Sequence, residues 1–153
     1  MKFQFPQGHE SAFYFPGEAV MAEIISTYDW SATLLGAAAT WPQGLRNAVS
    51  LCLHSPSPMM VLWGAALVQI YNRAFTPLLA DKHPVAMGKP CRHTWPELCD
   101  DGAPMVKKVM SEGQSVYIQE QLVVINNEQQ YYTFSCIPLF DETNPGTPPL
   151  ARW

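Results

Sequence analysis

An α+β domain, in which short helices lie over one face of an antiparallel sheet, is the fold class that this 153-residue sequence predicts. Three observations support it. Two helical periods open the chain, two pairs of strand-like segments follow, and a stretch of short turns separates those pairs. Helices and strands in this order segregate into separate layers around one core, as they do in α+β domains.

The first helix is expected to begin at Glu18, directly after Pro16-Gly17. Apolar residues recur there at the spacing of one face of a helix, and the positions between them are polar. The stripe consists of Val20, Met21, Ile24, Ile25 and Tyr28. A helix with such a stripe needs an apolar surface to pack on, which is either its own sheet or a second chain.

The second helix is expected after the sequence "TWPQ" at residues 40–43. Thr40 is expected to cap it, Pro42 to occupy its first turn, and Gln43 to complete a capping box. Its apolar stripe consists of Leu45, Ala48, Val49 and Cys52. The "SPSP" sequence at 55–58 ends it, because proline cannot continue a helix.

Beyond those prolines the period changes to that of strands. Residues 59–63 and 67–71 are short apolar runs joined by Gly64-Ala65-Ala66, a pattern typical of a β-hairpin. Asn72 stands where the N-cap of a following helix would lie. Residues 81–101 hold three prolines and no sustained period, which favours short helical turns over one long element.

One more helix and a second hairpin complete the predicted order. The helix ends at Gly113, and its stripe consists of Met105, Val106, Val109 and Met110. The strands are expected at 115–125 and 129–140, joined by an Asn-Asn turn that tolerates left-handed backbone. On the second strand one face is expected to carry Tyr132, Phe134, Cys136 and Phe140.

Composition and charge exclude several function classes. The formal net charge is −4 and the nine Lys and Arg residues are scattered, so no basic surface for nucleic acid is expected. The uncharged stretch at 48–71 is interrupted by prolines and Gly64, so it does not predict a membrane span. The N-terminus lacks the pattern of a signal peptide, so we expect a cytoplasmic protein.

The four cysteines are Cys52, Cys91, Cys99 and Cys136. Because thiols stay reduced in the cytoplasm, we expect all four to be free.

Four segments of the chain resemble the PAS domain, a small sensory fold of signalling proteins. These are "DWSATLLG", "WPQGLRNAVSL", "LWGAALVQIYNRAFTPLLADKHPVAMGKP" and "TWPEL". In particular, they resemble the N-terminal PAS segment found on many bacterial sensor histidine kinases, over about residues 18–141. The resemblance implies an input module for two-component signal transduction that senses a ligand or a redox state, or passes a dimer signal to a kinase. The chain has no glycine-rich nucleotide-binding boxes and no phosphoacceptor-helix pattern, so we expect no enzymatic activity from it.

The resemblance also divides the chain. Residues 1–17 are expected to form an irregular arm, 18–55 the N-terminal helices, 56–141 the PAS core, and 142–153 a proline-rich tail. The implied partners are a second copy of the chain, a signalling kinase or another effector, and a small molecule.

PAS domains end with a fifth strand between the first and the penultimate strand. The end of this chain, "TNPGTPPLARW", holds three prolines, which cannot donate ladder hydrogen bonds, so its own fifth strand is expected to be absent. Unpaired buried backbone groups would cost about 1–3 kcal/mol each. The N-terminal arm, a strand of another chain or a distorted pairing by residues 150–153 could fill the place. A truncated or frame-altered chain is the alternative.

The sequence "GKPCRH" at 88–93 invites comparison with flavin-binding photosensory PAS domains, whose motif is Gly-x-Asn-Cys-Arg-Phe-Leu-Gln. The matching positions are Gly88, Cys91 and Arg92. The positions that depart from the motif are Pro90, His93, Thr94 and Trp95. Because the polar groups that would hold the flavin are missing, a structural Cys91 is favoured.

For the cysteines and histidines of this region, a role in metal binding, haem binding or catalysis is a weaker hypothesis than simple structural packing. The weak metal-ligand candidates have irregular spacing and are His83, Cys91, His93 and Cys99. Haem ligation by His83 or His93 competes with a simple turn histidine. Cys91 and His93 are two residues apart and would point apart on a helix, so a hydrolytic or small-molecule-binding domain that uses them is the runner-up. The sequence assigns no metal, catalytic residue or cofactor.

An apolar cup between the helices and the sheet is the favoured site for a small ligand. Its candidate lining residues are Tyr71, Phe75, Cys91, Trp95, Met105, Val109, Ile118 and Phe134. The alternative that these side chains simply fill the core is the stronger expectation from residue type alone. The stripe of Val20, Ile24 and Ile25 is the candidate dimer interface, with packing on its own sheet as the alternative.

Overall fold

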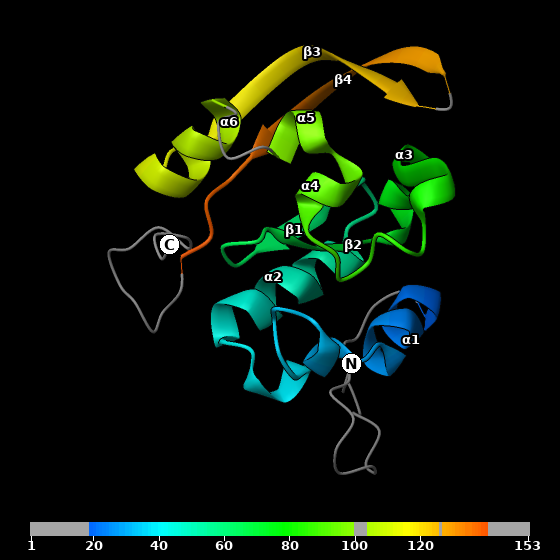
Figure 1. Cartoon of the computed structure of the whole chain (residues 1–153), viewed down its shortest axis with the longest axis vertical. Coiled ribbons are helices and arrows are strands. Elements are labelled where there is room, and N and C mark those ends of the chain that lie inside the picture. Colours follow the sequence, from blue (N-terminus) through cyan, green and yellow to red (C-terminus); the bar gives the residue numbers. More distant parts are fainter. Residues whose placement is uncertain (1–18, 100–103, 126, 141–153) are drawn as a thin grey trace, which may run out of the picture.

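Two antiparallel hairpins and a set of short helices make up the fold, which a computed structural model describes for residues 19–99, 104–125 and 127–140 (Figure 1). The strands are β1 (Met60–Trp63), β2 (Val68–Tyr71), β3 (Val116–Ile125) and β4 (Glu128–Cys136). The α-helices are α1 (Ala19–Thr27), α2 (Gln43–His54), α3 (Thr76–Leu79), α4 (Cys91–Thr94), α5 (Pro96–Cys99) and α6 (Pro104–Val106). The predicted α+β class is confirmed.

Short 3₁₀ and π turns complete the elements. They are η1 (Trp30–Ala32), η2 (Ala38–Thr40), η3 (Arg73–Phe75), η4 (Ala80–Lys82) and the π turn η5 (Lys107–Ser111). In Figure 1, α1 and α2 lie on one side of β1–β2, while α4 and α5 lie on the other side, between β1–β2 and the β3–β4 hairpin. The first hairpin is therefore covered by helices on both faces.

The two N-terminal helices bury the predicted stripes. Met21 and Ile25 of α1 are buried in the core, and Ile24 packs against it. All four predicted stripe residues of α2 are buried as well. The stripe of α2 and the described part of the α1 stripe are therefore directed into the core of their own chain, whereas the side chain of Val20 lies outside the described residues.

The predicted capping box of α2 is wrong. Pro42 occupies the N-cap without a side-chain hydrogen bond. The Thr40 hydroxyl instead donates to the Ala37 carbonyl over 2.7 Å, because Thr40 ends the preceding turn η2. Gln43 Nε2 donates to Asn47 Oδ1, also over 2.7 Å.

The β1–β2 hairpin presents a different set of side chains to each helical layer. Met60 pairs with Tyr71, and Leu62 pairs with Gln69, so these four residues share one face. That face looks toward α4, because Gln69 is hydrogen-bonded to Thr94. The opposite face, on the α2 side, carries the buried residues Val61, Trp63, Val68 and Ile70.

Asn72 caps η3 as predicted and also ties the hairpin to the end of α2. Its Oδ1 accepts from the backbone N–H of Phe75 and of Met59, each over 3.1 Å. Its Nδ2 donates to the carbonyls of Ser55 and Ser57 over 3.0 and 2.8 Å. The single side chain therefore satisfies four backbone groups, and it is 2% exposed.

The β3–β4 hairpin turns at Asn127, which has the left-handed φ of 64° that the Asn-Asn pair predicts. A register shift lies between Ile118 and Gln121. The half-buried Tyr132, Phe134 and Cys136 share the inner face, as predicted. The expected place of Phe140 on that face is wrong, because the strand ends at Cys136.

Beyond Cys136 the alternation of the strand no longer applies. Phe140 is 52% exposed, whereas Leu139 packs against the core. Pro138 follows the strand end closely and cannot donate to a ladder.

The two hairpins form two separate two-stranded sheets. Within the described residues no strand joins β1 to β4. The chain end on which the expected absence of a fifth strand depends, residues 141–153, lies outside the described residues. Two of the predicted replacements, residues 1–17 and 150–153, lie outside the described residues.

Candidate functional site

A buried polar side chain lies at the centre of the β2 face that looks toward α4. Gln69 is fully buried, and its Nε2 donates to Thr94 Oγ1 over 2.6 Å. Its Oε1 has no hydrogen-bond partner among the described residues. A buried amide oxygen without a partner costs free energy, so a group that donates to it would stabilise this site.

Lys82 and Trp95 lie next to Thr94 and, together with Gln69 and Thr94, form what we call the Gln69 cluster. The Lys82 ammonium donates to the Thr94 carbonyl over 2.8 Å and lies 4.6 Å from the centroid of the Trp95 ring. This distance suits a cation–π contact. Trp95 is 5% exposed, and its indole N–H is also without a partner among the described residues. Gln69, which is hydrogen-bonded to Thr94, therefore has an unsatisfied acceptor, and Trp95, which follows Thr94 in the chain, has an unsatisfied donor.

Tyr71 lies two positions along β2 from Gln69. Its hydroxyl oxygen lies 3.0 Å from His83 Nδ1, and its ring centroid lies 6.2 Å from that of Phe75. Burial raises the pKa of Tyr71 to about 12. Tyr71 is therefore a neutral phenol at neutral pH, able to donate a hydrogen bond but not to act as a base.

The segment before α4 holds the Gln69 cluster against β2. Gly88 N–H donates to the Gln69 carbonyl over 2.9 Å, and Gln69 N–H donates to the Lys89 carbonyl over 3.1 Å. Cys91 N–H donates to the Leu67 carbonyl over 2.9 Å. Residues 88–91 thus pair along the outer edge of β2, which fixes the start of α4 relative to Gln69.

The expectation of four reduced thiols is wrong at two positions, because Cys91 and Cys99 form a disulfide. On an unbroken helix, residues eight apart lie about 12 Å from one another. The break between α4 and α5 at Trp95 brings the two Cα atoms to 5.8 Å, within the range that a disulfide needs. Cys52 and Cys136 are free.

The disulfide also affects two hypotheses from the sequence, namely a catalytic Cys91–His93 pair and a metal site that uses Cys91 and Cys99. Cys91 holds no thiolate in this state, and His93 is exposed, so they do not form a nucleophile and base pair. His83 is directed to Tyr71. The described residues contain no group of three or more side chains that could hold a metal ion, so the four candidate ligands are not brought together as one site.

The predicted cup residues fall into two neighbouring groups. Tyr71, Cys91 and Trp95 are buried in the main core cluster, and Phe75 packs against it. The second group, next to the β3–β4 hairpin, contains Met105, Val109, Ile118 and Phe134, of which Val109 alone is buried. Met105 Sδ lies 3.5 Å from Cys136 Sγ, so α6 contacts the inner face of β4.

Val106 and Val123 connect the two groups. Both pack against the main core cluster, one from α6 and the other from β3. The main core cluster is therefore in contact with α6 and β3, the elements that carry Met105 and Ile118 of the second group.

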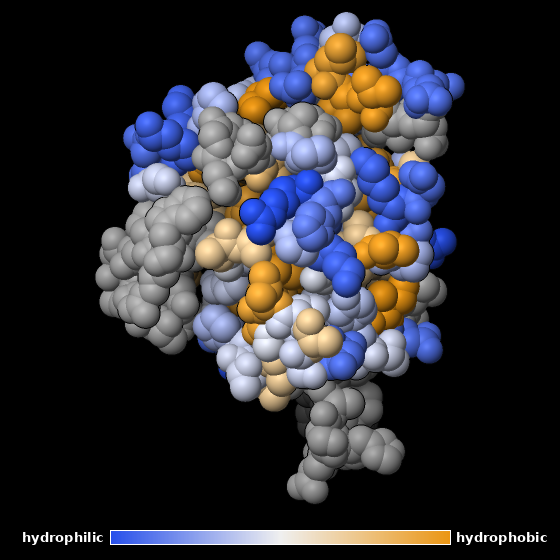
Figure 2. All heavy atoms as spheres, viewed as in Figure 1, coloured by the Kyte–Doolittle hydropathy of each residue, from blue (hydrophilic) through white to orange (hydrophobic). Residues whose placement is uncertain are grey.

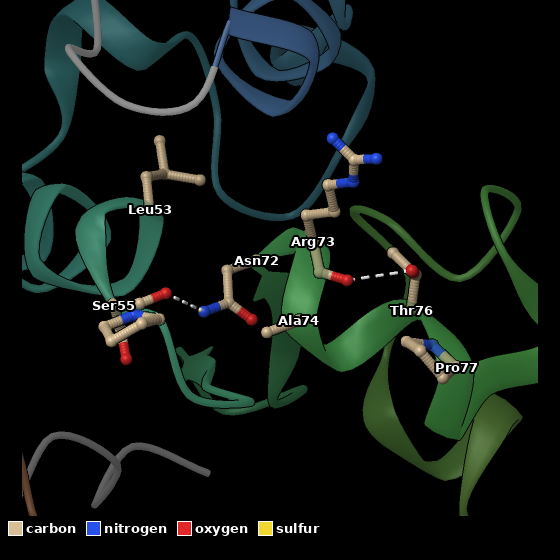
Figure 3. A pocket seen from close by; sticks show the side chains of 8 residues that line it. Leu53, Ser55, Asn72, Arg73, Ala74, Thr76 and Pro77 are labelled. Atoms are coloured by element: carbon tan, nitrogen blue, oxygen red, sulfur yellow. Dashed lines mark hydrogen bonds between the residues drawn. The ribbon is translucent and has the colours of Figure 1, made fainter.

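A separate hollow lies between the end of α2 and the η3–α3 segment (Figure 3). It measures about 370 Å³ and is lined by Leu53, Ser55, Pro56, Asn72, Arg73, Ala74, Thr76 and Pro77. Figure 3 shows Asn72 directed at the backbone of Ser55, so this side chain is engaged in holding the fold. None of the predicted cup residues lines this hollow.

Sequence reasoning missed Gln69, Thr94 and Lys82. A signal for Gln69 was present, because it interrupts the otherwise apolar run "LVQIY" at 67–71. A glutamine within a fully buried strand needs a partner, and Thr94 provides it. Thr94 and Lys82 carry no such signal, since both lie in turn-rich sequence where polar residues are common.

Comparison with known proteins agrees with this architecture. The family model described as "PAS fold" matches residues 54–145. No curated protein and no solved structure matches the chain. Within the described ranges, every helix is too short or too polar to cross a bilayer.

Proposed function

Because this chain belongs to the PAS fold family, we propose that it is a cytoplasmic input module of the histidine kinase type, which binds a small molecule in the cup over β2. PAS domains are sensory and regulatory modules, so binding would control a signalling kinase or another effector. The observation that supports a ligand is the pair of unsatisfied groups, Gln69 Oε1 and Trp95 Nε1.

The chemistry of the cup suggests the class of ligand. Tyr71 and Trp95 offer aromatic surface, which suits a small molecule with an apolar body. Gln69 Oε1 requires a donor, and Trp95 Nε1 requires an acceptor. We therefore propose a small metabolite that carries both a hydroxyl or amine hydrogen and a carbonyl or carboxylate oxygen.

Native mass spectrometry of the purified protein tests this proposal. Wild type should carry an excess mass that a Gln69→Leu variant loses, because leucine cannot accept a hydrogen bond. Gln129→Leu is the matched control, since Gln129 is exposed on β4, and it should keep the ligand. Bare chain mass for wild type, with an ordered water on Gln69 in a crystal structure, would contradict ligand binding.

We further propose that a second copy of the chain covers the outer face of the β3–β4 hairpin. Four large side chains on that face lie in water and are Tyr117, Leu122, Val124 and Tyr131, with exposed fractions of 66, 40, 59 and 68%. Figure 2 shows a group of hydrophobic residues, surrounded by hydrophilic ones, at the top of the molecule where this hairpin lies. The N-terminal stripe is less suited to this role, since Ile25 is 1% exposed and Ile24 packs against the core of its own chain.

A two-fold pairing would place the same apolar face on both sides of the contact. Sedimentation equilibrium should then find a dimer for wild type and a monomer for Tyr131→Glu. Val85→Glu is the matched control, because Val85 is 71% exposed but lies outside the hairpin. A wild-type monomer at 100 μM, or equal loss of the dimer in both variants, would contradict this interface.

A further inference from the structure

We propose that Cys91 and Cys99 are a reversible thiol–disulfide pair, which in its oxidised form clamps α5 and Trp95 against β2. The disulfide links Cys91, the first residue of α4, to Cys99, the last residue of α5. Because Trp95 belongs to the proposed ligand site, any effect of this bond on ligand binding rests on the proposed function, whereas the redox chemistry of the two cysteines does not.

One end of this clamp is firmly held. Cys91 N–H donates to the Leu67 carbonyl over 2.9 Å, and its neighbour Pro90 forms a bridge with Val68 of β2. Cys91 is also fully buried. Its sulfur atom therefore occupies one position relative to the sheet, whichever redox state the pair is in.

At the other end Cys99 is buried too, with 4% exposed, but the helix that carries it is short. Helix α5 spans only four residues, and Cys99 N–H donates to the Trp95 carbonyl over 2.9 Å. A helix of this length has little stability of its own. In Figure 1, α5 lies between α4 and α6, on the path to the β3–β4 hairpin. Opening the disulfide would thus release the segment that leads from the cup to that hairpin.

The free cysteines do not compete with this pair. Burial raises the pKa of Cys52 to about 12, and its thiol donates to the Met59 carbonyl over 3.3 Å. Burial also raises the pKa of Cys136. Since the thiolate is the species that attacks a disulfide, neither residue would exchange readily with Cys91 or Cys99. The pair can therefore cycle without scrambling.

The proposed cytoplasmic location favours a reversible bond. Disulfides in that compartment are rare, and those that form are usually transient or redox-sensing. A dithiol reductant of the thioredoxin class would attack Cys99 Sγ with one thiolate when α5 opens locally. The bond between the two cysteine sulfurs breaks, Cys91 leaves as a thiolate and takes up a proton.

The second thiol of the reductant then resolves the mixed disulfide and releases Cys99 as a thiol. Two electrons and two protons have passed to the pair, and the reductant has become a disulfide. Oxidised glutathione would drive the reverse reaction, which yields two molecules of reduced glutathione.

Counting thiols by mass spectrometry tests the pair directly. Protein purified without reductant and treated with oxidised glutathione should bind two iodoacetamide groups when denatured, one on each free cysteine. After dithiothreitol it should bind four, the total number of cysteines. Reoxidation of the folded, reduced protein should return the count to two, with Cys91 and Cys99 linked in the peptide map. Four modified cysteines after oxidation, or a different pairing, would overturn the proposal.

The consequence for structure is tested by hydrogen exchange of wild type in both redox states. Reduction should raise the rate of amide hydrogen exchange in the peptide at 91–99 by about tenfold or more, whereas the rate in the peptide at 43–54 should stay the same. Cys99→Ala should reproduce the reduced pattern, and Cys136→Ala should respond to dithiothreitol as wild type does. Equal exchange in both states, or global unfolding on reduction, would contradict a clamp and indicate a purely structural bond.

Native mass spectrometry of the two redox states separates this proposal from ligand binding. If the disulfide forms and breaks reversibly but neither redox state carries a bound ligand, the thiol–disulfide proposal stands and the ligand proposal is contradicted. If a ligand is retained but all four cysteines remain thiols after oxidation, the ligand proposal stands and the thiol–disulfide proposal is contradicted.

Discussion

Gln69 of β2 and Thr94 of α4 are joined by a hydrogen bond of 2.6 Å inside the core, although 25 residues separate them in the chain. This contact ties the helical layer to the central face of the first hairpin. It also leaves Gln69 Oε1 as the acceptor that a ligand would use.

Replacing Thr94 by valine should destabilise the fold. Valine keeps the shape of threonine but leaves the buried Gln69 amide without its acceptor, at a cost of about 1–3 kcal/mol in free energy of unfolding. Urea denaturation measures this loss. Thr40→Val is the control, because the hydroxyl of Thr40 is exposed and water can replace its hydrogen bond. A similar loss in both variants would show that the Gln69–Thr94 bond has no special role.

Asn72→Ala should be among the most destabilising polar substitutions in the chain. The Ser55 carbonyl and the Met59 N–H lose the partner that the Asn72 side chain provides. The Ser57 carbonyl and the Phe75 N–H each lose one of two hydrogen bonds. We expect a loss of about 2–4 kcal/mol in urea denaturation. Asn47→Ala removes an exposed amide from α2 and should cost less than about 1 kcal/mol. Comparable losses would contradict the role of Asn72 as a tie between α2 and the hairpin.

Gly88→Ala separates a steric clash from backbone strain when it is compared with Gly64→Ala. Both glycines have left-handed φ, at 72° and 76°, so both variants pay about 1–2 kcal/mol for that conformation. A Cβ at Gly88 would also lie 2.7 Å from the Tyr28 ring, whereas nothing lies within 4 Å at Gly64. Thermal unfolding should therefore show a clearly lower Tm for Gly88→Ala. Equal Tm values would mean that Tyr28 moves aside freely.

Alkaline pH should destabilise the protein through Tyr71 and Cys52. The pKa of Tyr71 rises from 10.0 to about 12 and that of Cys52 rises from 9.0 to about 12, so the unfolded chain loses these protons first. Because the folded state then binds more protons, this stabilisation is complete below about pH 9 and is lost as the pH rises to about 12.

Urea unfolding midpoints between about pH 8 and pH 11 measure this slope. Tyr71→Phe should reduce the dependence of the unfolding midpoint on pH above about pH 10, since phenylalanine has no proton to lose. Tyr131→Phe is the matched substitution at an exposed tyrosine, since Tyr131 is 68% exposed. Identical slopes for Tyr71→Phe and wild type would show that Tyr71 does not contribute.

Much of the fold could be predicted because its signals are local. The stripe of α2 follows from the helical period, and the cap at Asn72 follows from a side chain that reaches a backbone group three residues away. The turn at Asn127 follows from the tolerance of asparagine for left-handed backbone. The capping box at Thr40 failed because a neighbouring turn, η2, competed for the same residue.

The site depended on distances that no local pattern contains. The sequence by itself determined the class of fold, the two hairpins and the buried stripe of α2, since each follows from period and residue type. Only the tertiary structure decided that Gln69 meets Thr94 and that Cys91 meets Cys99. The first contact needs α4 to cross β2, and the second needs a break at Trp95 that brings residues 91 and 99 together. Hydrophobic burial drives both arrangements, but it is non-directional, so the partners are set by how the layers pack.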